Sequence, residues 1–236
     1  MRTEEAFIKL EANDKSFLGR LVLQVGGFYS KESELIRGEH QNTAKGSTPT
    51  SLFAITSRAA PKLTTPLPVD AERAGSNSLL KMTLDHCENS GVREALHLED
   101  DFRTKHAFTC LHVWMVLRRL RKSGSEGKRV SQFFYDNFQH EVELSVHREG
   151  VRVRVNKWLR QLEDIFFGAA KAYDDAIDKH TEDFADVLYR NLYSDKGNRE
   201  YCNALARYTI REMVSLSMTD TEAVLSGQVK FNASTD

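Results

Sequence analysis

Cysteine, proline and long apolar runs are scarce in this chain of 236 residues. The three cysteines, Cys87, Cys110 and Cys202, are odd in number and far apart, a pattern that suits a reducing compartment better than a disulfide scaffold. The longest apolar runs are far shorter than the roughly 20 residues that cross a bilayer, so we expect no transmembrane helix. The first residues, MRTEEAFIKLEANDK, are too acidic for a transit peptide and lack the apolar stretch of a secretory signal.

Proline is confined to one short part of the chain. All four prolines lie between Pro49 and Pro68, and none follows from Val69 to Asp236. Because proline inside a helix costs about 3 kcal/mol, the proline-free stretch with apolar residues at i, i+3 and i+4 predicts an all-α fold. We expect a helical bundle of about six to eight helices with a long disordered insertion. Six of the helices are expected at roughly 79–89, 101–122, 128–147, 151–180, 182–193 and 199–217.

Composition divides the chain into four segments. Residues 1–41 predict one or two helices, broken near Gly26 and Gly27. Residues 42–78 are rich in Thr, Ser, Ala, Gly and Pro with little periodicity, which predicts a low-complexity insertion or loop. Residues 79–227 carry the main helical body, and residues 228–236 are expected to form a flexible tail.

Residues 109–124, TCLHVWMVLRRLRKSG, combine an apolar helix with a cationic end. A helix that is apolar nearly all round is buried on most sides, and each large side chain contributes roughly 1.5–3 kcal/mol when fully buried. We therefore expect this segment to be the central helix of the bundle. Its apolar positions are Phe108, Leu111, Val113, Trp114, Met115, Val116, Leu117 and Leu120.

Histidines and cysteines near this helix are weak candidates for a metal site. His106 and Cys110, four apart, share a helical face, whereas Cys110 and His112 point about 200° from each other. Two ligands do not make a zinc site, and no CxxC or HxxxH spacing supports them. We expect Cys110 to pack as a small apolar residue and His112 to be partly buried with one hydrogen bond. The same interpretation holds for His86 and Cys87.

Catalytic motifs are missing from the sequence. It has no GxSxG, P-loop, GxGxxG or HExxH, so we expect no catalytic residues, no metal site and no cofactor. Asp174 and Asp178, four apart, could hold a cation, but di-iron bundles need Glu-x-x-His on facing helices. We expect these acids on a solvated face, opposite the apolar stripe that begins at Trp158. The alternative is a helical metal- or haem-binding protein or enzyme that uses this pair with His106, Cys110 and His112.

Charge is balanced in total but not along the chain. The net charge is −1, yet eleven cations and five anions between Met115 and Arg160 give +6, and ten anions and five cations between Gln161 and Glu200 give −5. This bias predicts a surface that docks an anionic partner such as RNA, anionic lipid or an acidic protein, by phosphate contact rather than base reading. A well-solvated surface is the other interpretation. The expected contact residues are Arg118, Arg119, Arg121, Lys122, Lys128, Arg129, Arg152 and Arg154.

Several segments resemble one known family. The runs TCLHVWMVLRRLRKSG, QFFYDNFQHEVE and FFGAAKAYDDAI are similar to the ubiquinol–cytochrome c chaperone family, and GGFYSKESELIRG, residues 26–38, is similar to the segment that opens its domain. The resemblance covers most of residues 16–41 and 79–178, and it makes residues 1–41 the N-terminal helical part of the chaperone domain. The insertion at 42–78 and the polar stretch RTKHAF, residues 103–108, depart from the family pattern.

The resemblance implies an assembly factor and chaperone for ubiquinol–cytochrome c reductase (complex III), and not an enzyme. The implied partners are a small helical assembly factor, newly synthesised cytochrome b, and the mitochondrial ribosome, whose RNA phosphates and proteins the basic residues would contact. The implied location is the mitochondrion, peripheral to the inner membrane on its matrix side. No presequence is visible in the sequence.

Overall fold

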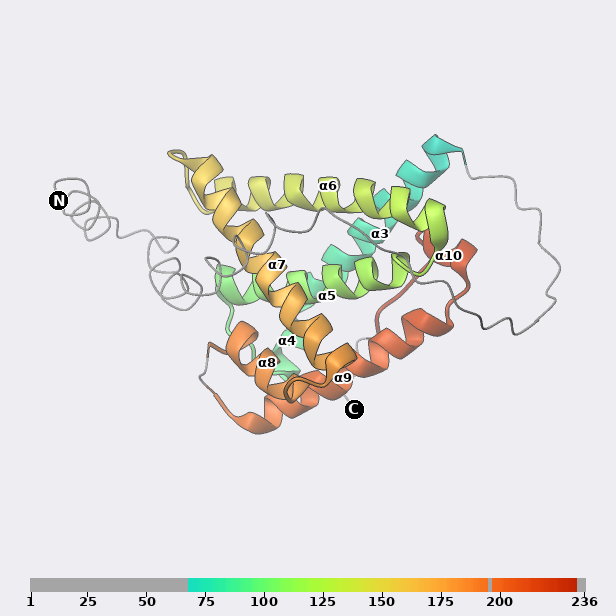
Figure 1. The fold of residues 1–236 in the computed structure, drawn as a ribbon. Coiled ribbons are helices and arrows are strands. Elements are labelled where there is room, and N and C mark those ends of the chain that lie inside the picture. The colour runs from blue at the N-terminus through green and yellow to red at the C-terminus, as the bar shows by residue number, and fades with distance from the viewer. Residues whose placement is uncertain (1–67, 195–196, 233–236) are drawn as a thin grey trace, which may run out of the picture. The chain divides into compact units, whose positions relative to one another are not determined.

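The computed structural model describes residues 68–194 and 197–232, and within these ranges every regular element is a helix (Figure 1). This confirms the all-α prediction. The helices are α3 (Val69–Glu88), α4 (Ser90–Ala95), α5 (Phe102–Leu120), α6 (Gly124–Arg148), α7 (Val155–Lys179), α8 (Phe184–Leu192), α9 (Arg199–Met218) and α10 (Thr221–Leu225). The segments expected at 1–41 and over most of 42–78 lie outside the described residues.

Helix α3 begins ten residues before the expected start at 79, so the prediction of a loop is wrong for residues 69–78. Pro68 stands at the N-cap with φ −57°, and Asp70 and Glu72 in the first turn suit the helix dipole. Gly75 and Ser76 are weak helix formers, yet both are buried. A Cβ on Gly75 would lie 1.9 Å from the carbonyl oxygen of Leu225, so packing against α10 requires glycine here. Tertiary packing therefore overrides local propensity.

The other differences are smaller. Helix α6 begins at Gly124 instead of 128, and α7 begins at Val155 instead of 151. The short helices α4 and α10 were not expected, because five or six residues are too few to show helical periodicity. Helices α8 and α9 lie within one or two residues of their expected bounds.

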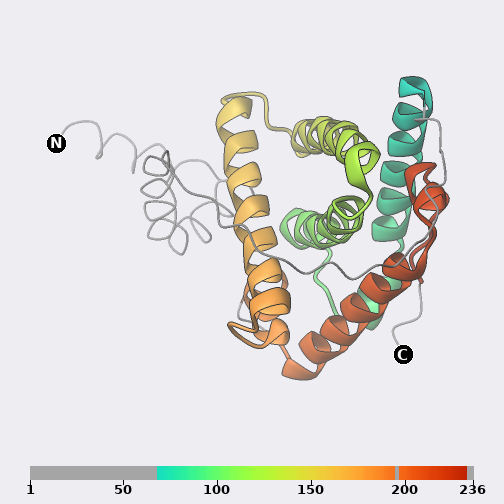
Figure 2. The same ribbon diagram turned by 45° about the vertical axis from the view of Figure 1, so that its right-hand side comes forward.

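Helix α5 is the central helix, as the sequence predicts. It contacts α3, α6, α7, α8 and α9, and Figure 2 shows α3 and α7 on opposite sides of it. Phe108, Leu111, Trp114, Met115 and Leu120 are all at most 1% exposed. No helix in the described ranges is long and apolar enough to span a bilayer.

The segment that follows α10 packs on the body, which corrects the expectation of a flexible tail for residues 228–232. Val229 and Phe231 are buried. The ring of Phe231 lies 5.2 Å from that of His86 and 4.8 Å from that of His112, centroid to centroid. The backbone N–H of Asn232 donates to Oε2 of Glu212 at 3.0 Å. Residues 233–236 lie outside the described part of the chain.

Candidate functional site

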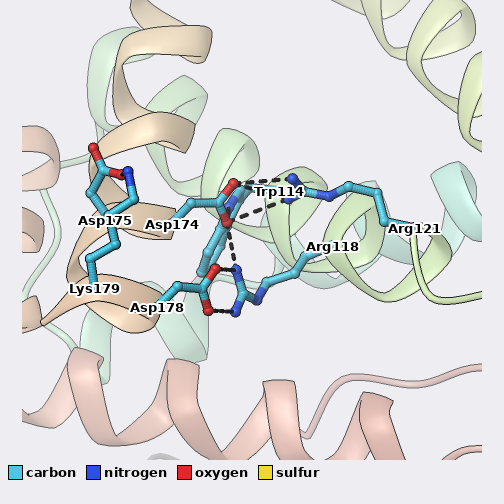
Figure 3. Close-up of polar contacts among 7 residues, drawn as sticks. All are labelled: Trp114, Arg118, Arg121, Asp174, Asp175, Asp178 and Lys179. Carbon is cyan, nitrogen blue, oxygen red and sulfur yellow. Dashed lines mark hydrogen bonds and ion pairs between the residues drawn. The ribbon is translucent and has the colours of Figure 1, made fainter. Parts of the chain in front are cut away.

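The cationic end of α5 meets two carboxylates of α7 (Figure 3). Nη1 of Arg118 donates to Oδ1 of Asp174 at 2.7 Å and to Oδ2 of Asp178 at 2.9 Å, and its Nη2 pairs with the other oxygen of Asp178. Nη1 of Arg121 donates to Oδ2 of Asp174 at 3.1 Å. The indole N–H of Trp114 donates to Oδ1 of Asp174 at 3.0 Å. We call these five residues the α5–α7 network.

Helical spacing builds this network. Residues 114, 118 and 121 follow one face of α5, and residues 174 and 178 lie one turn apart on α7. The buried stripe of α7, which includes Ala169, Tyr173 and Ala176, places Asp174 at the edge of the interface. The expectation that both acids lie on a solvated face is therefore wrong for Asp174, whose side chain is only 26% exposed.

Charge in the network is largely compensated. Hydrogen bonding from Arg118 lowers the pKa of Asp178 below its ordinary value, and hydrogen bonding to Asp178 raises the pKa of Arg118. Two arginines of the basic stretch thus pair with two aspartates of the acidic stretch, between α5 and α7. Arg118 and Arg121 form ion pairs with aspartates of the same fold. These pairs leave both side chains less available to an anionic partner.

Arg119 and Arg129 also have partners inside the fold. Arg119 is 9% exposed; its Nε donates to the carbonyl of Leu216 at 2.8 Å and its Nη2 to the carbonyl of Thr219 at 2.9 Å. Arg119 therefore ties α5 to the end of α9. Nη2 of Arg129 pairs with Oε1 of the fully buried Glu72 at 2.6 Å and links α6 to α3. Neither contact was visible in the sequence, because each joins residues far apart in the chain.

The remaining four predicted contact residues are exposed, but they lie in two places. Lys122 and Lys128 flank the turn between α5 and α6, whereas Arg152 and Arg154 lie in the turn between α6 and α7. At about 1.5 Å per residue, the length of α6 separates the two pairs by about 30 Å. The structure therefore does not bring the eight predicted residues into one patch.

His112 is fully buried and makes two hydrogen bonds, not one. Its Nδ1 lies 2.8 Å from the carbonyl oxygen of Phe108, and its Nε2 lies 2.7 Å from the hydroxyl of Tyr208. The same hydroxyl lies 2.8 Å from Nε2 of His86. Burial lowers the pKa of His112 to about 3. Tyr208 was missed in the sequence, since nothing local to it indicates a partner 96 residues away.

The prediction that Cys110 packs as a small apolar residue is confirmed. Cys110 is buried in the core, with its Sγ 3.4 Å from Nε2 of His106, and Cys87 and Cys202 are buried free thiols. Burial raises the pKa of Cys110 and that of Cys87, the latter to about 12. In the part of the chain that the structure describes, no group of three or more His, Cys, Asp or Glu side chains could hold a metal ion.

Helix α9 carries an apolar stripe on its outer face. Ile210, Val214 and Met218 follow at i, i+4 and i+8 and are 47%, 50% and 81% exposed. The opposite face of α9 is buried and includes Leu205, Thr209, Glu212 and Leu216. The spacing of the three residues is visible in the sequence, but only the structure shows which of the two faces is outside. We call these three residues the α9 stripe.

An all-helical bundle that presents an apolar stripe and separated cations on its outside has the form of a binding protein. The sequence model of the ubiquinol–cytochrome c chaperone family matches residues 94–231, so the chain belongs to this family. A crystal structure of the Cbp3 homolog from Brucella abortus has the same fold, with a TM-score of 0.63 and 20% sequence identity over 69% of this chain and 91% of that one.

Curated relatives agree with this membership. The chain is 27% identical over 139 residues to ubiquinol-cytochrome-c reductase complex assembly factor 1 of Xenopus laevis, covering 58% of this chain and 70% of that protein. It is 26% identical over 137 residues to the Mus musculus assembly factor 1, covering 57% of this chain and 46% of that protein. It is 24% identical over 147 residues to protein CBP3, mitochondrial, of Saccharomyces cerevisiae, covering 58% of this chain and 43% of that protein. The matched region is thus less than half of the mouse and yeast proteins.

Proposed function

We propose that this protein is an assembly factor and chaperone of ubiquinol–cytochrome c reductase (complex III), and not an enzyme. It receives newly synthesised cytochrome b together with a small helical partner, and it docks on the mitochondrial ribosome. It works in the mitochondrion, on the matrix side of the inner membrane. Family membership supports the general role, and the α9 stripe is the observation that supports binding of a helical partner.

The α9 stripe has the spacing by which helices recognise one another. Apolar residues at i, i+4 and i+8 form a ridge, and an amphipathic partner helix buries such a ridge with its own apolar face. Exposed apolar side chains that lie in a row on one helix mark an interaction site more strongly than the same residues scattered singly. We assign this ridge to the small helical partner.

Exposed cations of the fold are the residues that would contact the ribosome. Lys122 and Lys128, at the turn between α5 and α6, are the candidates, because the nearby arginines 118, 119, 121 and 129 already bond within the fold. Lysine contacts to RNA phosphates release counterions, so the association should weaken steeply as salt rises.

A pull-down of the tagged protein from its own cells, in mild detergent, tests the proposal. We expect a small helical protein, cytochrome b and ribosomal proteins at low salt, with the ribosomal proteins lost at high salt. Val214→Asp in the α9 stripe should lose the small partner, whereas Ser215→Asp, an exposed site beside the stripe on the same helix, should keep it. Recovery of no complex III component would contradict the proposed function, and salt-insensitive ribosome binding would contradict the role of the lysines.

A further inference from the structure

The turn between α6 and α7 exposes a valine between two arginines. We call residues 149–160 the α6–α7 tip; it joins the ends of two helices at one corner of the described fold (Figure 1). Val153 is 73% exposed, and both Arg152 and Arg154 are exposed. An apolar side chain so exposed loses the free energy of burial unless a partner covers it.

The two arginines beside Val153 are not compensated in the way that the arginines of α5 are. Four cations and one acid, Glu149, give residues 149–160 a charge of +3. Arg148, just before the tip, pairs with Glu141 on α6. Within residues 68–194 and 197–232, neither Arg152 nor Arg154 has an ion-pair or hydrogen-bond partner through its side chain. Their full charge therefore faces the solvent.

The backbone conformation at Arg154 fixes the turn that exposes Val153 and the two arginines. Arg154 adopts a left-handed conformation, φ 58° and ψ 29°, which costs a non-glycine residue about 1 kcal/mol or more. Its carbonyl accepts hydrogen bonds from the backbone N–H groups of Lys157 at 2.9 Å and Trp158 at 3.3 Å, which begins α7. The sharp reversal turns the chain back at Arg154, immediately after the exposed Val153. Trp158, half-buried, lies one turn further along α7.

We propose that the α6–α7 tip docks on an anionic lipid surface. Arginine side chains near such a surface are attracted to the headgroups, while an exposed valine gains by entering the acyl boundary and a tryptophan suits the interface. RNA phosphates would satisfy the arginines but would leave Val153 in water. A bilayer satisfies both kinds of side chain, so the valine decides between the two partners.

This contact rests on the proposed function, which places the protein at the inner membrane, and it names the surface of the chain that meets the lipid. Lys122 and Lys128 lie about 30 Å away at the other end of α6, so ribosome docking and lipid docking would use opposite ends of one helix. The contact is an interfacial one, because the residues that make it lie in a turn between two helices.

Flotation of the full chain with vesicles tests the proposal. We expect the protein to float with vesicles that contain phosphatidylglycerol and not with vesicles of phosphatidylcholine alone. Arg152→Gln with Arg154→Gln should weaken the vesicle affinity about thirtyfold, from the usual contribution of a cation near an anionic surface. Lys122→Gln with Lys128→Gln removes the same charge at the far end of α6 and should leave the affinity unchanged. Val153→Ser should weaken it several-fold at unchanged charge.

Two further comparisons make the outcome decisive. Arg154→Gly places glycine at φ 58°, where it is unstrained, so this variant should stay folded and still lose affinity for anionic vesicles. Three results would overturn the proposal: no flotation with anionic vesicles, equal losses in the tip and lysine double variants, or full vesicle binding by Val153→Ser. Loss of binding to ribosomal RNA by the tip variants, with vesicle binding intact, would assign the tip to RNA instead.

Discussion

The hydroxyl of Tyr208 on α9 lies 2.7 Å from Nε2 of His112 on α5 and bonds a second histidine, His86, at 2.8 Å. Nδ1 of His112 faces the carbonyl of Phe108, so Nδ1 carries the proton of the neutral ring and Nε2 is an acceptor. Tyr208 therefore donates to His112, and its oxygen accepts from His86. The direction of each hydrogen bond in this chain of three side chains follows from that single carbonyl.

Replacing Tyr208 with phenylalanine tests the chain of hydrogen bonds. Tyr208→Phe removes the hydroxyl that lies 2.7 Å from Nε2 of His112, and a buried nitrogen left without a partner costs about 1–3 kcal/mol. We expect a loss of that size in the free energy of unfolding, measured by urea denaturation. Tyr201→Phe, on the same helix with its ring against His97 at 4.0 Å, is the control and should cost much less. Equal losses would contradict the assigned hydrogen bonds.

Stability should fall as the solution becomes mildly acidic. Burial lowers the pKa of His112 to about 3 and that of His106 to about 4, against about 6.5 in the unfolded chain. The unfolded state therefore binds more protons below pH 6.5, and stability present above that pH is lost as pH falls toward these folded values. At pH 5 the loss is about 2 kcal/mol per histidine.

Urea titrations between pH 7.5 and pH 5 would measure this loss. The unfolding midpoint should be flat at the upper end and should fall below about pH 6.5. His86 is a third histidine whose pKa burial lowers, so His106→Gln removes one of three such groups and should reduce the slope by about a third. A midpoint that stays constant down to pH 5 would show that none of these rings is kept neutral by the fold.

Some of the fold could be predicted because its signal is local. The central position of α5 follows from an apolar run that covers the whole circumference of the helix. This run is visible in the sequence of α5 alone, without knowledge of the helices that pack on it. The start of α3 could not be predicted, because Gly75 and Ser76 resemble loop residues until α10 is seen against them. The docked C-terminal segment was missed for the same reason, since Phe231 packs on residues more than a hundred positions earlier.

Most of the site could not be predicted from charge counted along the chain. Arg118 and Asp174 are 56 residues apart, and the pairing of α5 with α7 decides that they neutralise each other. The sequence correctly indicated a cationic end for α5 and an i, i+4 acid pair on α7, but it could not show that the two face each other. Arg152 and Arg154 lie in the turn between α6 and α7 with their side chains exposed, which is why that part of the basic segment keeps its charge.

Asp174 should contribute far more to stability than its neighbour Asp175. Asp174→Ala leaves the indole N–H of Trp114 without its acceptor and two guanidinium groups without their shared carboxylate, so we expect a loss of about 2 kcal/mol in the free energy of unfolding. Asp175 pairs with Lys171 and Lys179 on its own helix, away from the network (Figure 3). Asp175→Ala makes the same change in charge and should cost little. Similar unfolding midpoints for the two variants would show that the α5–α7 network does not hold α7 in place.

Phe231 should anchor the segment that follows α10. Phe231→Ala removes a buried ring from against His86 and His112, and such truncations cost about 3–5 kcal/mol in a core. Residues 228–232 are near the end of the chain and can detach while the rest stays folded. The destabilisation therefore cannot exceed the free energy with which this segment binds to the body, and we expect a loss of about 2–3 kcal/mol.

Two measurements separate docking from simple loss of packing. In Phe231→Ala the amide of Asn232 should exchange freely with solvent, because its bond to Glu212 opens when the segment detaches. Water then reaches His86, whose pKa is lowered by burial, so that pKa should rise toward its ordinary value. Lys230→Ala, one residue earlier and exposed, should change neither. If both variants behave alike, residues 228–232 are as mobile as their sequence suggested.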